Sequence, residues 1–382
     1  MRAGRIKQKA VLIVLYYYHP YVSGVSVCAK RVAEGLVENG YKVTVLTSRH
    51  DKTLPKNQTI NGVNVVRRPV MLRAGKGVLM PTFWFDIIRY ARKNDYINPH
   101  LPMAESGLSS FFIPKRKIIT TYQCDIFLGV GKINILLASL IMNLMSIQLI
   151  RSRVVVPSTH DYLEHSKMKK YLSKANPIYP TVPVADFSPI DPRSLYKKLQ
   201  IQPKDIKIGF VGRIVYEKGI NYLLESIPYL DKKISNFKII IVGNYENVAG
   251  GSIKEQLDRY MGLYPDKIIF TGFLSDNERN QFYSGLDVFV LPSIDPLEAY
   301  GMVQVEAMLC GVPVVASNLP GVREIVTKTK YGRISKIKNP EDIAKQIIEV
   351  IQNPGKYKPS RQQVIKLFDP QESIKAYSRL MP

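Results

Sequence analysis

The chain has 382 residues, of which 46% are hydrophobic and 22% are charged, and its formal net charge is +23. This length exceeds the size at which one hydrophobic core stops growing, so two domains are expected, and the apolar share excludes a largely disordered chain. Three cysteines, Cys28, Cys124 and Cys310, are too few for a disulfide framework and lie in apolar surroundings. A reducing compartment is therefore the simpler expectation.

Short apolar runs alternate with helical patterns along the whole chain. The basic residues 1–10 and the apolar residues 11–15 lack the length and the cleavage pattern of a signal peptide, so we expect a first buried strand there. Further strands are expected over residues 41–47, 63–68, 117–121, 154–157, 206–211, 238–242, 267–270, 288–291 and 313–316. This alternation predicts an α/β fold with two wound halves, parallel sheets and right-handed crossovers.

Two helical segments bear on the organisation of the first half. In the helix expected over residues 26–38, one apolar face is formed by Val25, Cys28, Val32 and Leu36. Residues 133–150 form the most apolar run, which approaches the length of a membrane span but carries a polar stripe of Ser139, Asn143 and Ser146. We expect a helix buried between sheet and surface, and a helix lying in a membrane interface is the alternative.

A strand-to-helix loop in the second half carries two cations. The expected strand over residues 206–211 is followed by Gly212, Arg213, Lys218 and Gly219, and then by a helical pattern. Arginine offers a planar fork that suits phosphate, and lysine offers a mobile point charge. These residues suit a departing diphosphate, although an arginine and a lysine in a loop are often merely solvated.

The segment from Glu298 to Glu306 places two carboxylates eight positions apart around Gly301. We expect Glu298 in a loop and Glu306 on the second turn of a helix, whose first N–H groups lack internal partners and attract an anion. Because carboxylates repel phosphate but accept hydrogen bonds from hydroxyls, the arrangement suggests a sugar attached to a nucleoside diphosphate. A solvated acidic loop followed by an ordinary buried helix is the alternative.

Together these segments resemble the retaining glycosyltransferase family four, also described as glycosyl transferases group 1, whose fold is called GT-B. The C-terminal half of that family carries a VGR…KG loop and a Glu-x7-Glu motif in this order and at about this spacing. The stretch Tyr18-His-Pro-Tyr-Val-Ser-Gly24-Val25 looks like its N-terminal glycine loop, and Asn318-Leu-Pro-Gly321-Val-Arg-Glu324 looks like its PG…E loop. The resemblance covers nearly the whole chain.

The resemblance implies two Rossmann-like, doubly wound, parallel-sheet domains facing across a cleft. Residues 1–190 would form the acceptor-binding domain and residues 191–370 the nucleotide-sugar-binding domain, joined through a proline-bearing hinge at residues 177–192. A C-terminal helix within residues 371–382 would cross back onto the first domain. Ligands in such sheets lie outside the carboxyl ends of the strands, which places the chemistry in the cleft.

For the activity, the resemblance implies retaining transfer of a hexosyl group from a nucleotide-diphosphate sugar. Arg213, Lys218 and Glu298 are the expected catalytic residues, with the cations stabilising the leaving diphosphate. Glu306 would hold the ribose and Glu298 a hydroxyl of the donor sugar. The expected donor-binding residues are Gly212, Arg213, Lys218, Phe273, Leu274, Glu298, Ala299, Tyr300, Gly301, Met302, Val303 and Glu306. The sequence has no Asp-x-Asp pair that would clamp a divalent metal, so we expect neither a metal nor another cofactor.

Four residues are candidates on the acceptor side. Gln123 stands where the family often has a histidine, and glutamine can bind a sugar hydroxyl but cannot take its proton at neutral pH. Asp125 is expected either to bind hydroxyls or to cap the next helix. His100 is expected to anchor a loop rather than to catalyse. Gly24 would let the acceptor or a phosphate approach the first helix, with a simple turn as the alternative.

The positive charge is concentrated in the first half. Residues 1–190 contain 27 Lys and Arg against 10 Asp and Glu, whereas residues 191–382 contain 27 against 21. A basic surface can dock on an anionic membrane, so we expect a cytoplasmic enzyme that acts on a glycan or lipid-linked acceptor, with peripheral attachment to the inner membrane face as an option. No nucleic-acid motif is present, and nucleic acid is not an expected partner. A non-catalytic sugar-nucleotide-binding subunit and another GT-B enzyme, such as an epimerase, are the alternatives.

Overall fold

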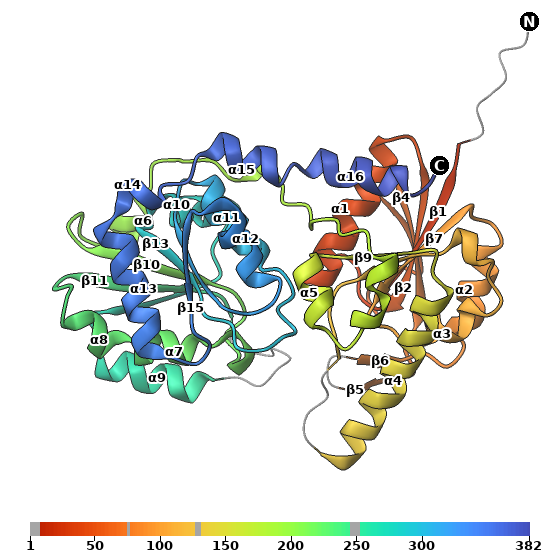
Figure 1. Ribbon diagram of the computed structural model, residues 1–382, viewed down its shortest axis with the longest axis horizontal. Coiled ribbons are helices and arrows are strands. Elements are labelled where there is room, and N and C mark those ends of the chain that lie inside the picture. The colour runs from red at the N-terminus through yellow and green to blue at the C-terminus, as the bar shows by residue number, and fades with distance from the viewer. Residues whose placement is uncertain (1–7, 75–76, 127–130, 245–252) are drawn as a thin grey trace, which may run out of the picture. The chain divides into compact units, whose positions relative to one another are not determined.

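The computed structural model describes residues 8–74, 77–126, 131–244 and 253–382 (Figure 1). The chain divides into two compact units, of which unit 1 comprises Met1–Thr181 and Gln371–Pro382, and unit 2 comprises Val182–Pro370. This division falls inside the proline-bearing stretch at residues 177–192, and the sequence-based boundary after residue 190 falls in the same stretch. Each unit is built on its own sheet of mainly parallel strands, so the predicted doubly wound α/β fold is confirmed.

Among the described residues of unit 1, seven strands form one sheet in the order β3-β4-β2-β1-β7-β8-β9, in which only β3 runs antiparallel to its neighbour. The elements in chain order are β1 (Ala10–Val14), α1 (Gly24–Glu38), β2 (Lys42–Arg49), β3 (Asn57–Ile60), β4 (Val63–Pro69), β5 (Leu72–Ala74), β6 (Gly77–Leu79), α2 (Phe83–Ala91), β7 (Tyr96–Leu101), α3 (Glu105–Ser110), η1 (Lys115–Lys117), β8 (Ile119–Tyr122), α4 (Lys132–Arg151), β9 (Val154–Pro157), α5 (His160–His165), η2 (Lys169–Lys174) and α16 (Pro370–Arg379).

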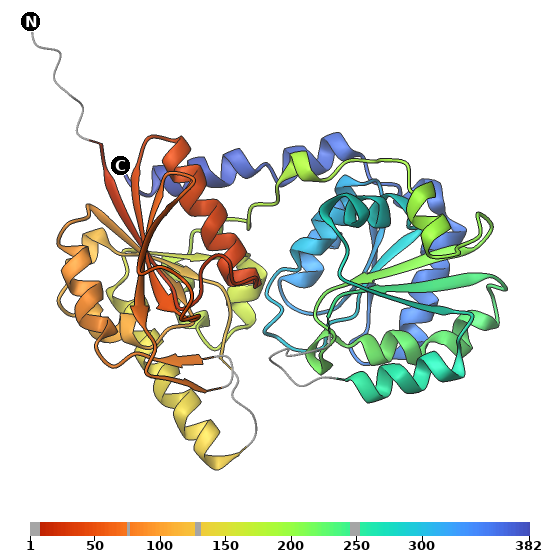
Figure 2. The ribbon, with the colours of Figure 1, turned by 180° about the vertical axis from the view of Figure 1, so that it is seen from behind.

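One face of the unit 1 sheet is covered by α1 and α16 (Figure 2). The predicted apolar face of α1 is confirmed, since Cys28, Val32 and Leu36 are buried and Val25 packs partly buried against the same cluster. A Cβ atom added at Gly35 would lie 2.6 Å from Cγ1 of Ile374, so the missing side chain lets α16 approach α1 closely. The C-terminal helix therefore completes the core of unit 1.

Among the described residues of unit 2, six parallel strands form one sheet in the order β12-β11-β10-β13-β14-β15. The elements in chain order are η3 (Val184–Asp186), α6 (Arg193–Lys198), β10 (Ile206–Val211), η4 (Tyr216–Lys218), α7 (Ile220–Glu225), α8 (Ile227–Asp231), β11 (Phe237–Val242), α9 (Lys254–Leu263), β12 (Ile268–Gly272), α10 (Asp276–Gly285), β13 (Val288–Leu291), α11 (Met302–Leu309), β14 (Val314–Ser317), α12 (Val322–Thr329), β15 (Gly332–Ser335), α13 (Pro340–Gln352), α14 (Pro354–Tyr357) and α15 (Arg361–Leu367).

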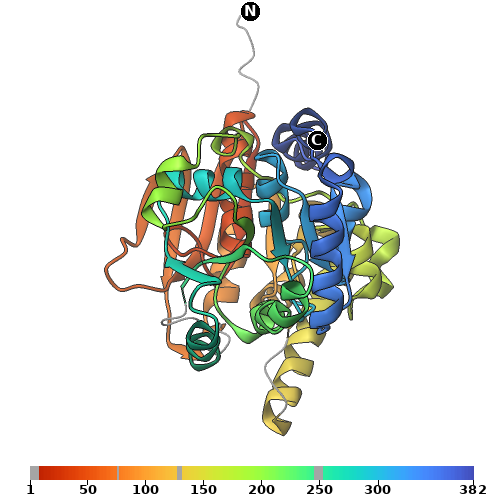
Figure 3. The ribbon, with the colours of Figure 1, turned by 90° about the vertical axis from the view of Figure 1, so that its left-hand side faces the viewer.

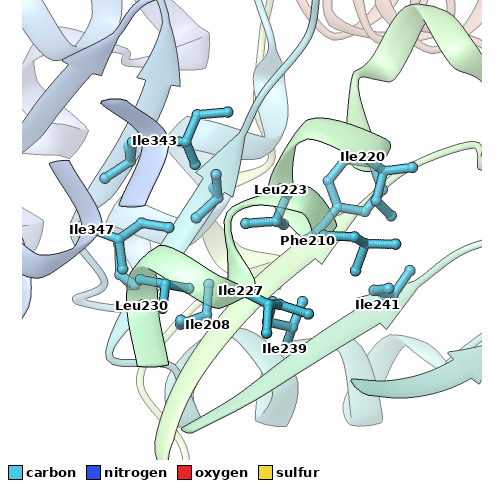
Figure 4. Close-up of a cluster of buried hydrophobic side chains, with 14 of the residues drawn as sticks. Ile208, Phe210, Ile220, Leu223, Ile227, Leu230, Ile239, Ile241, Ile343 and Ile347 are labelled. Atoms are coloured by element: carbon cyan, nitrogen blue, oxygen red, sulfur yellow. The ribbon is translucent and has the colours of Figure 1, made fainter. Parts of the chain in front are cut away.

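Strand β10 lies between helices on both faces of the unit 2 sheet. Ile208 and Phe210 point into a cluster with α7, α8 and α13 (Figure 4). Gly209 faces the other side, where an added Cβ atom would lie 2.7 Å from Cδ2 of Leu286 and 2.9 Å from the ring of Phe282. This alternation follows from the two-residue period of a strand and fixes β10 at the centre of the unit.

The predicted helix over residues 133–150 is less buried than expected. It forms as α4, and its C-terminal half buries Met142, Met145 and Leu149. Its N-terminal half extends past the other elements of unit 1 (Figure 3). The window Asn134–Arg151 is long and apolar enough for a membrane span by length and composition, yet only 22% of it is buried. The expectation of a buried helix is therefore wrong for the first half of α4.

Candidate functional site

The centre of the unit 2 sheet contains a topological switch point. The chain passes from β10 outward to β11 and β12, and then returns to the other side of β10 to begin β13. The loops that follow β10 and β13 therefore diverge from adjacent strands at the carboxyl edge of the sheet, where open α/β sheets bind ligands. Lys218 lies in the first of these loops and Glu298 in the second.

Lys218 and Glu298 form an ion pair across this switch point. Their side chains are 19% and 16% exposed, respectively, so the pair is half-buried rather than fully solvated. The loops are joined at the backbone, because Ile294 N–H donates to the carbonyl of Glu217 at 3.0 Å. Gly219 (φ +65°) permits this approach, since a Cβ atom there would collide with the carbonyl oxygen of Pro292. The sequence thus brings a cation and a carboxylate together from residues 80 positions apart.

The loop that carries Glu298 is held by short-range hydrogen bonds. Asp295 accepts from Leu297 N–H through its Oδ1 atom at 2.8 Å, and its carbonyl accepts from Glu298 N–H at 3.0 Å. The hydroxyl of Ser293 donates to Oε2 of Glu298 at 3.3 Å. Sequence reasoning missed Ser293 and Asp295, although a serine shortly after a strand and an aspartate followed by a proline are typical of a structured turn.

Arg213 and Gly212 lie at the exit of β10. Arg213 pairs with Glu217 at 2.5 Å and is 42% exposed. A Cβ atom at Gly212 would lie 3.9 Å from Cε of Lys218, which shows that the lysine side chain runs back over this glycine. Two cations therefore lie in one short loop, and each is neutralised by a nearby carboxylate.

The helix α11 begins directly after the second loop, with Gly301 as its N-cap residue in the left-handed region at φ +79°. A Cβ atom at Gly301 would lie 2.5 Å from Cδ2 of Leu291, so only glycine fits this turn without displacement of β13. The N-terminal residues Met302 and Val303 are half-buried, while Ala299 and Tyr300 before the helix are buried. The first N–H groups of α11 follow the ion pair immediately in the chain and favour an anion.

Glu306 lies one turn into α11, on the same face as Met302. Its Oε2 atom accepts a hydrogen bond from the hydroxyl of Tyr283 at 2.9 Å. Burial of the Tyr283 ring and the charge of Glu306 raise the pKa of that phenol well above its usual value, so the phenol remains a donor. Tyr283 fixes one oxygen of Glu306, and sequence reasoning missed it because it lies on α10.

Gln304 is a second buried residue that the sequence did not indicate. Its amide nitrogen donates to the carbonyls of Tyr300 and Val322, both at 3.1 Å. It therefore ties the N-terminus of α11 to the N-terminus of α12, within the predicted PG…E loop. A polar side chain three residues after a helix-starting glycine, inside an apolar run, is the signal that could have identified it.

Phe273 and Leu274 lie between Gly272, at the end of β12, and the N-cap residue Ser275 of α10. Gly272 adopts φ +68°, and the Phe273 side chain is 81% exposed. This short loop is at the same carboxyl edge of the sheet but two strands away from β10. The expected role of Phe273 and Leu274 in donor binding stays a prediction.

In unit 1, His100 and Gln123 belong to one buried hydrogen-bond network. The Gln123 amide donates to Nδ1 of His100 at 2.8 Å, and Nε2 of His100 pairs with Oδ1 of Asn98 at 2.9 Å. Asn98 in turn donates to the carbonyl of Ile119 and to Oγ1 of Thr121. Burial lowers the pKa of His100 to about 3, so its imidazole is neutral at ordinary pH. His100 lies in strand β7, and its bond with Gln123 holds the residue that directly follows β8. The expected role of His100 in anchoring a loop stays a prediction.

The other two acceptor-side candidates, Asp125 and Gly24, lie outside the His100–Gln123 network. Asp125 accepts hydrogen bonds from the hydroxyl of Tyr122 and, at 3.1 Å, from the backbone N–H of Lys167. The next helix is α4, whose N-cap residue is Gly131, so the alternative role of Asp125 as a helix cap is wrong. Gly24 is the first residue of α1, and an added Cβ atom would meet nothing within 4 Å.

The unit 1 sheet has its own switch point, between β1 and β7, and a pair that sequence reasoning missed lies there. The Tyr16 hydroxyl, just after β1, donates to Oε2 of Glu105 at 2.5 Å and accepts from Ala104 N–H at 3.2 Å. Burial raises the pKa of the Glu105 carboxyl. These two residues lie 89 positions apart in the chain, and no local pattern indicates that they pair.

Comparisons with known proteins place these features in a family. The sequence profile described as "Glycosyl transferases group 1" matches residues 193–366, and the profile described as "Glycosyltransferase Family 4" matches residues 22–175. An uncharacterized glycosyltransferase of Methanocaldococcus jannaschii is 27% identical over 378 residues, which cover 90% of each chain. The sulfoquinovosyl transferase SQD2 of Arabidopsis thaliana is 32% identical over 163 residues, which cover 41% of this chain and 29% of that protein.

Solved structures show the same fold. A glycosyltransferase from Rickettsia africae has 19% sequence identity and a TM-score of 0.74, with 98% of each chain covered. HepE from Anabaena, in complex with UDP-glucose, has 19% identity and a TM-score of 0.73, with 97% of this chain and 99% of that chain covered. The two family profiles match consecutive parts that include the Lys218–Glu298 site and every strand of the two main sheets except β1, so the chain belongs to the glycosyl transferases group 1 and is a GT-B glycosyltransferase.

Proposed function

We propose that this glycosyltransferase moves a hexosyl group from a nucleotide-diphosphate sugar to a glycan or lipid-linked acceptor, with retention of the anomeric configuration and without a metal ion. The observation that carries the proposal is the Lys218–Glu298 pair at the switch point of the unit 2 sheet, directly before the N-terminus of α11. A cation, a carboxylate and the amides of a helix N-terminus follow one another in the chain, and this combination fits a charged phosphate joined to a polyol.

Donor binding would rearrange the charges that the structure shows. Lys218 and Arg213 are each paired with a carboxylate, Glu298 and Glu217 respectively. A diphosphate carries more negative charge than either carboxylate and would draw both cations to itself. Glu298 would then accept from a hydroxyl of the donor sugar while it keeps its bond from Ser293. Glu306, oriented by Tyr283, would accept from the ribose hydroxyls.

The proposed reaction breaks the bond between the anomeric carbon and the phosphate oxygen and forms a bond from the same face to the acceptor oxygen. Negative charge grows on the leaving diphosphate, where Arg213, Lys218 and the α11 amides stabilise it. The acceptor proton passes to the leaving phosphate oxygen, so the path requires no strong protein nucleophile. The fixed cations supply the charge that a metal would supply in other transferases.

Two further parts of the proposal rest on other observations. HepE, a structural neighbour, is solved with UDP-glucose, which supports a nucleotide sugar as the donor. The three cysteines are free in the structure, with Cys28 and Cys310 buried, which supports a reducing, cytoplasmic compartment.

The proposal is tested with the purified full chain and a panel of UDP-sugars and GDP-sugars, each assayed with EDTA and with added Mg²⁺. We expect one donor to be hydrolysed or transferred at the same rate under both conditions, with product of unchanged anomeric configuration by proton NMR. A rate that depends on the added ion would contradict the metal-independent mechanism. Binding of a donor without turnover on any acceptor would instead support a non-catalytic sugar-nucleotide-binding subunit.

A further inference from the structure

The outer face of α4 carries an apolar stripe along the whole helix. Leu136, Leu140, Ile147 and Ile150 follow one another at helical spacing, interrupted only by Asn143. Leu136 is 74% exposed, Leu140 is 55% exposed and Ile150 is 53% exposed. The opposite face, with Met142, Met145 and Leu149, is buried in unit 1. On an ordinary protein surface, exposed apolar side chains are scattered. Exposed apolar side chains that recur along one face of a helix instead mark a binding surface.

The C-terminal half of α4 is fixed on both sides. On one side Gly107 of α3 allows close contact, because an added Cβ atom would collide with the carbonyl oxygen of Leu144. Arg151 extends this contact by donating to the carbonyls of Ser110 and Ile113, at 3.3 and 3.2 Å. On the other side, Lys174 of η2 donates to the carbonyl of Ile150 at 2.7 Å. A helix held in this way cannot stand across a bilayer without leaving its own core, so its exposed stripe suits a surface that lies along the helix.

The charge around α4 is mainly positive. Residues 126–160 contain no Asp or Glu. The carboxylates that border this stretch are engaged, Asp125 with Tyr122 and Asp161 with His165 at 3.4 Å. Exposed Lys169 and Lys170 lie on η2 beside α4. At the other flank, the chain after α3 continues through exposed Phe111 and Phe112 to exposed Lys115 and Arg116.

We propose that α4, with η2 and the segment after α3, docks on a membrane that contains anionic lipids, and that α4 lies in the interface plane without spanning it. Apolar side chains on a helix flanked by lysines and an arginine fit the boundary between acyl chains and negatively charged head groups. The basic flanks select this partner over a second copy of the chain, because two copies would bring like charges together across the α4 stripe.

The test measures binding of the full chain to sedimentable vesicles of phosphatidylcholine alone and with added phosphatidylglycerol, in the absence of any sugar nucleotide. We expect binding to the anionic vesicles that weakens with salt. The double variant Leu136→Ser/Leu140→Ser should bind at least about tenfold more weakly, since two exposed apolar side chains lose their burial. The control Leu263→Ser changes a leucine that is 58% exposed in unit 2 and should bind like the wild type.

The electrostatic part is tested by Lys169→Gln/Lys170→Gln, which should reduce both affinity and its salt dependence, against the control Lys232→Gln/Lys233→Gln in unit 2. Thermal unfolding confirms that each variant folds. Wild-type protein that stays in solution with anionic vesicles would overturn the proposal, as would a Leu136→Ser/Leu140→Ser variant that binds undiminished. A change of oligomeric state in these variants by light scattering, without vesicle binding by the wild type, would assign the stripe to self-association instead. Because the assay contains no donor, its outcome is independent of the proposed transferase activity.

Discussion

Lys218 and Glu298 satisfy each other in the structure, and this mutual pairing explains how a half-buried lysine and glutamate remain ready for a donor. A lone charge at such a position would be costly because it loses part of its hydration. The pair avoids this cost in the structure. Under the proposed function a diphosphate would compete for the lysine, and Ser293 would remain as a partner of Glu298, so the carboxylate would keep a hydrogen bond.

Lys218→Ala should reduce kcat/KM by about 10²- to 10³-fold, because one preorganised cation at the leaving group is removed. The fold should survive, since Ser293 still donates to Glu298. Steady-state kinetics with the best donor, together with a thermal unfolding curve, give the answer. Lys233→Ala, which removes an exposed lysine of the same unit, should leave the rate unchanged. Near-normal turnover by Lys218→Ala would refute its role in leaving-group stabilisation.

His100 makes a separate prediction about stability. The folded protein keeps this imidazole neutral because burial lowers its pKa to about 3, whereas a histidine in the unfolded chain takes up a proton below pH about 6.5. The unfolded state therefore binds more protons between these values, and folding stability must fall as the pH falls through 6.5 towards 3. Over most of this range the loss is about 1.4 kcal/mol per pH unit.

Denaturant unfolding at pH 7, 6, 5 and 4 measures this slope. We expect His100→Gln to be less stable at neutral pH, because the network to Asn98 and Gln123 is altered, but to lose less stability than the wild type on acidification. His160→Gln removes a histidine whose side chain is 61% exposed and should keep the wild-type slope. Parallel pH profiles for the wild type and His100→Gln would contradict the buried, neutral state of His100.

At the scale of elements, two glycines determine where the loops after β10 and β13 run. Gly219 brings the loop after β10 against Pro292, and Gly301 turns the chain from the second loop into α11. Both adopt positive φ, and at both a side chain would strike a neighbouring strand end or loop. The position of the Lys218–Glu298 pair is thus a consequence of backbone geometry as much as of the charged side chains.

Gly301→Ala should destabilise unit 2 by about 1–3 kcal/mol, since the added methyl group must adopt φ +79° and displace Leu291. Donor affinity should fall as well, because the N-terminus of α11 is displaced. Gly262→Ala is the matched control, as this glycine lies within α9 and a Cβ atom would meet nothing within 4 Å. It should be neutral or stabilise the protein by up to about 1 kcal/mol. Equal unfolding midpoints for the two variants would show that the turn at Gly301 is unstrained.

The strands that could be predicted from the sequence are those with continuous apolar runs. The predicted strands over residues 154–157, 206–211 and 288–291 coincide with β9, β10 and β13, because parallel strands that are buried on both faces are continuously apolar. Strand β7 was missed because Asn98, Pro99 and His100 interrupt its pattern, although all its residues from Ile97 are buried. Their polar groups are satisfied by a network that depends on distant residues and cannot be inferred from local sequence.

The candidate site, too, could be predicted only in part from local sequence. The spacing of Glu298 and Glu306 and the cations near Gly212 pointed to two loops that the structure joins through the Lys218–Glu298 pair, since chemistry and turn geometry both leave local signals. Tyr283 left none, because its partner Glu306 lies on another element, and the signal at Gln304 did not reveal its partner Val322 on α12. Local patterns thus predict which residues enter a site, whereas tertiary structure determines which residues hold them in place.

At the scale of the whole molecule, charge and chemistry are divided between the units. The loops that carry Lys218 and Glu298 are in unit 2, which contains 25 Lys and Arg against 21 Asp and Glu, whereas unit 1 contains 29 against 10. Unit 1 also contains the α4 stripe. Unit 1 is basic and has an exposed apolar surface, whereas unit 2 contains the candidate donor site. This division suits an enzyme that uses a soluble donor and an acceptor at a charged surface.

The most direct test of the central claim is a crystal structure of the full chain with the nucleotide sugar that binds best in the donor panel. We predict that the diphosphate contacts Nζ of Lys218 and the first amides of α11, that a sugar hydroxyl donates to Glu298, and that the ribose donates to Glu306. A nucleotide bound away from the carboxyl ends of β10 and β13, or a structure in which Lys218 and Glu298 stay paired beside the bound donor, would contradict it.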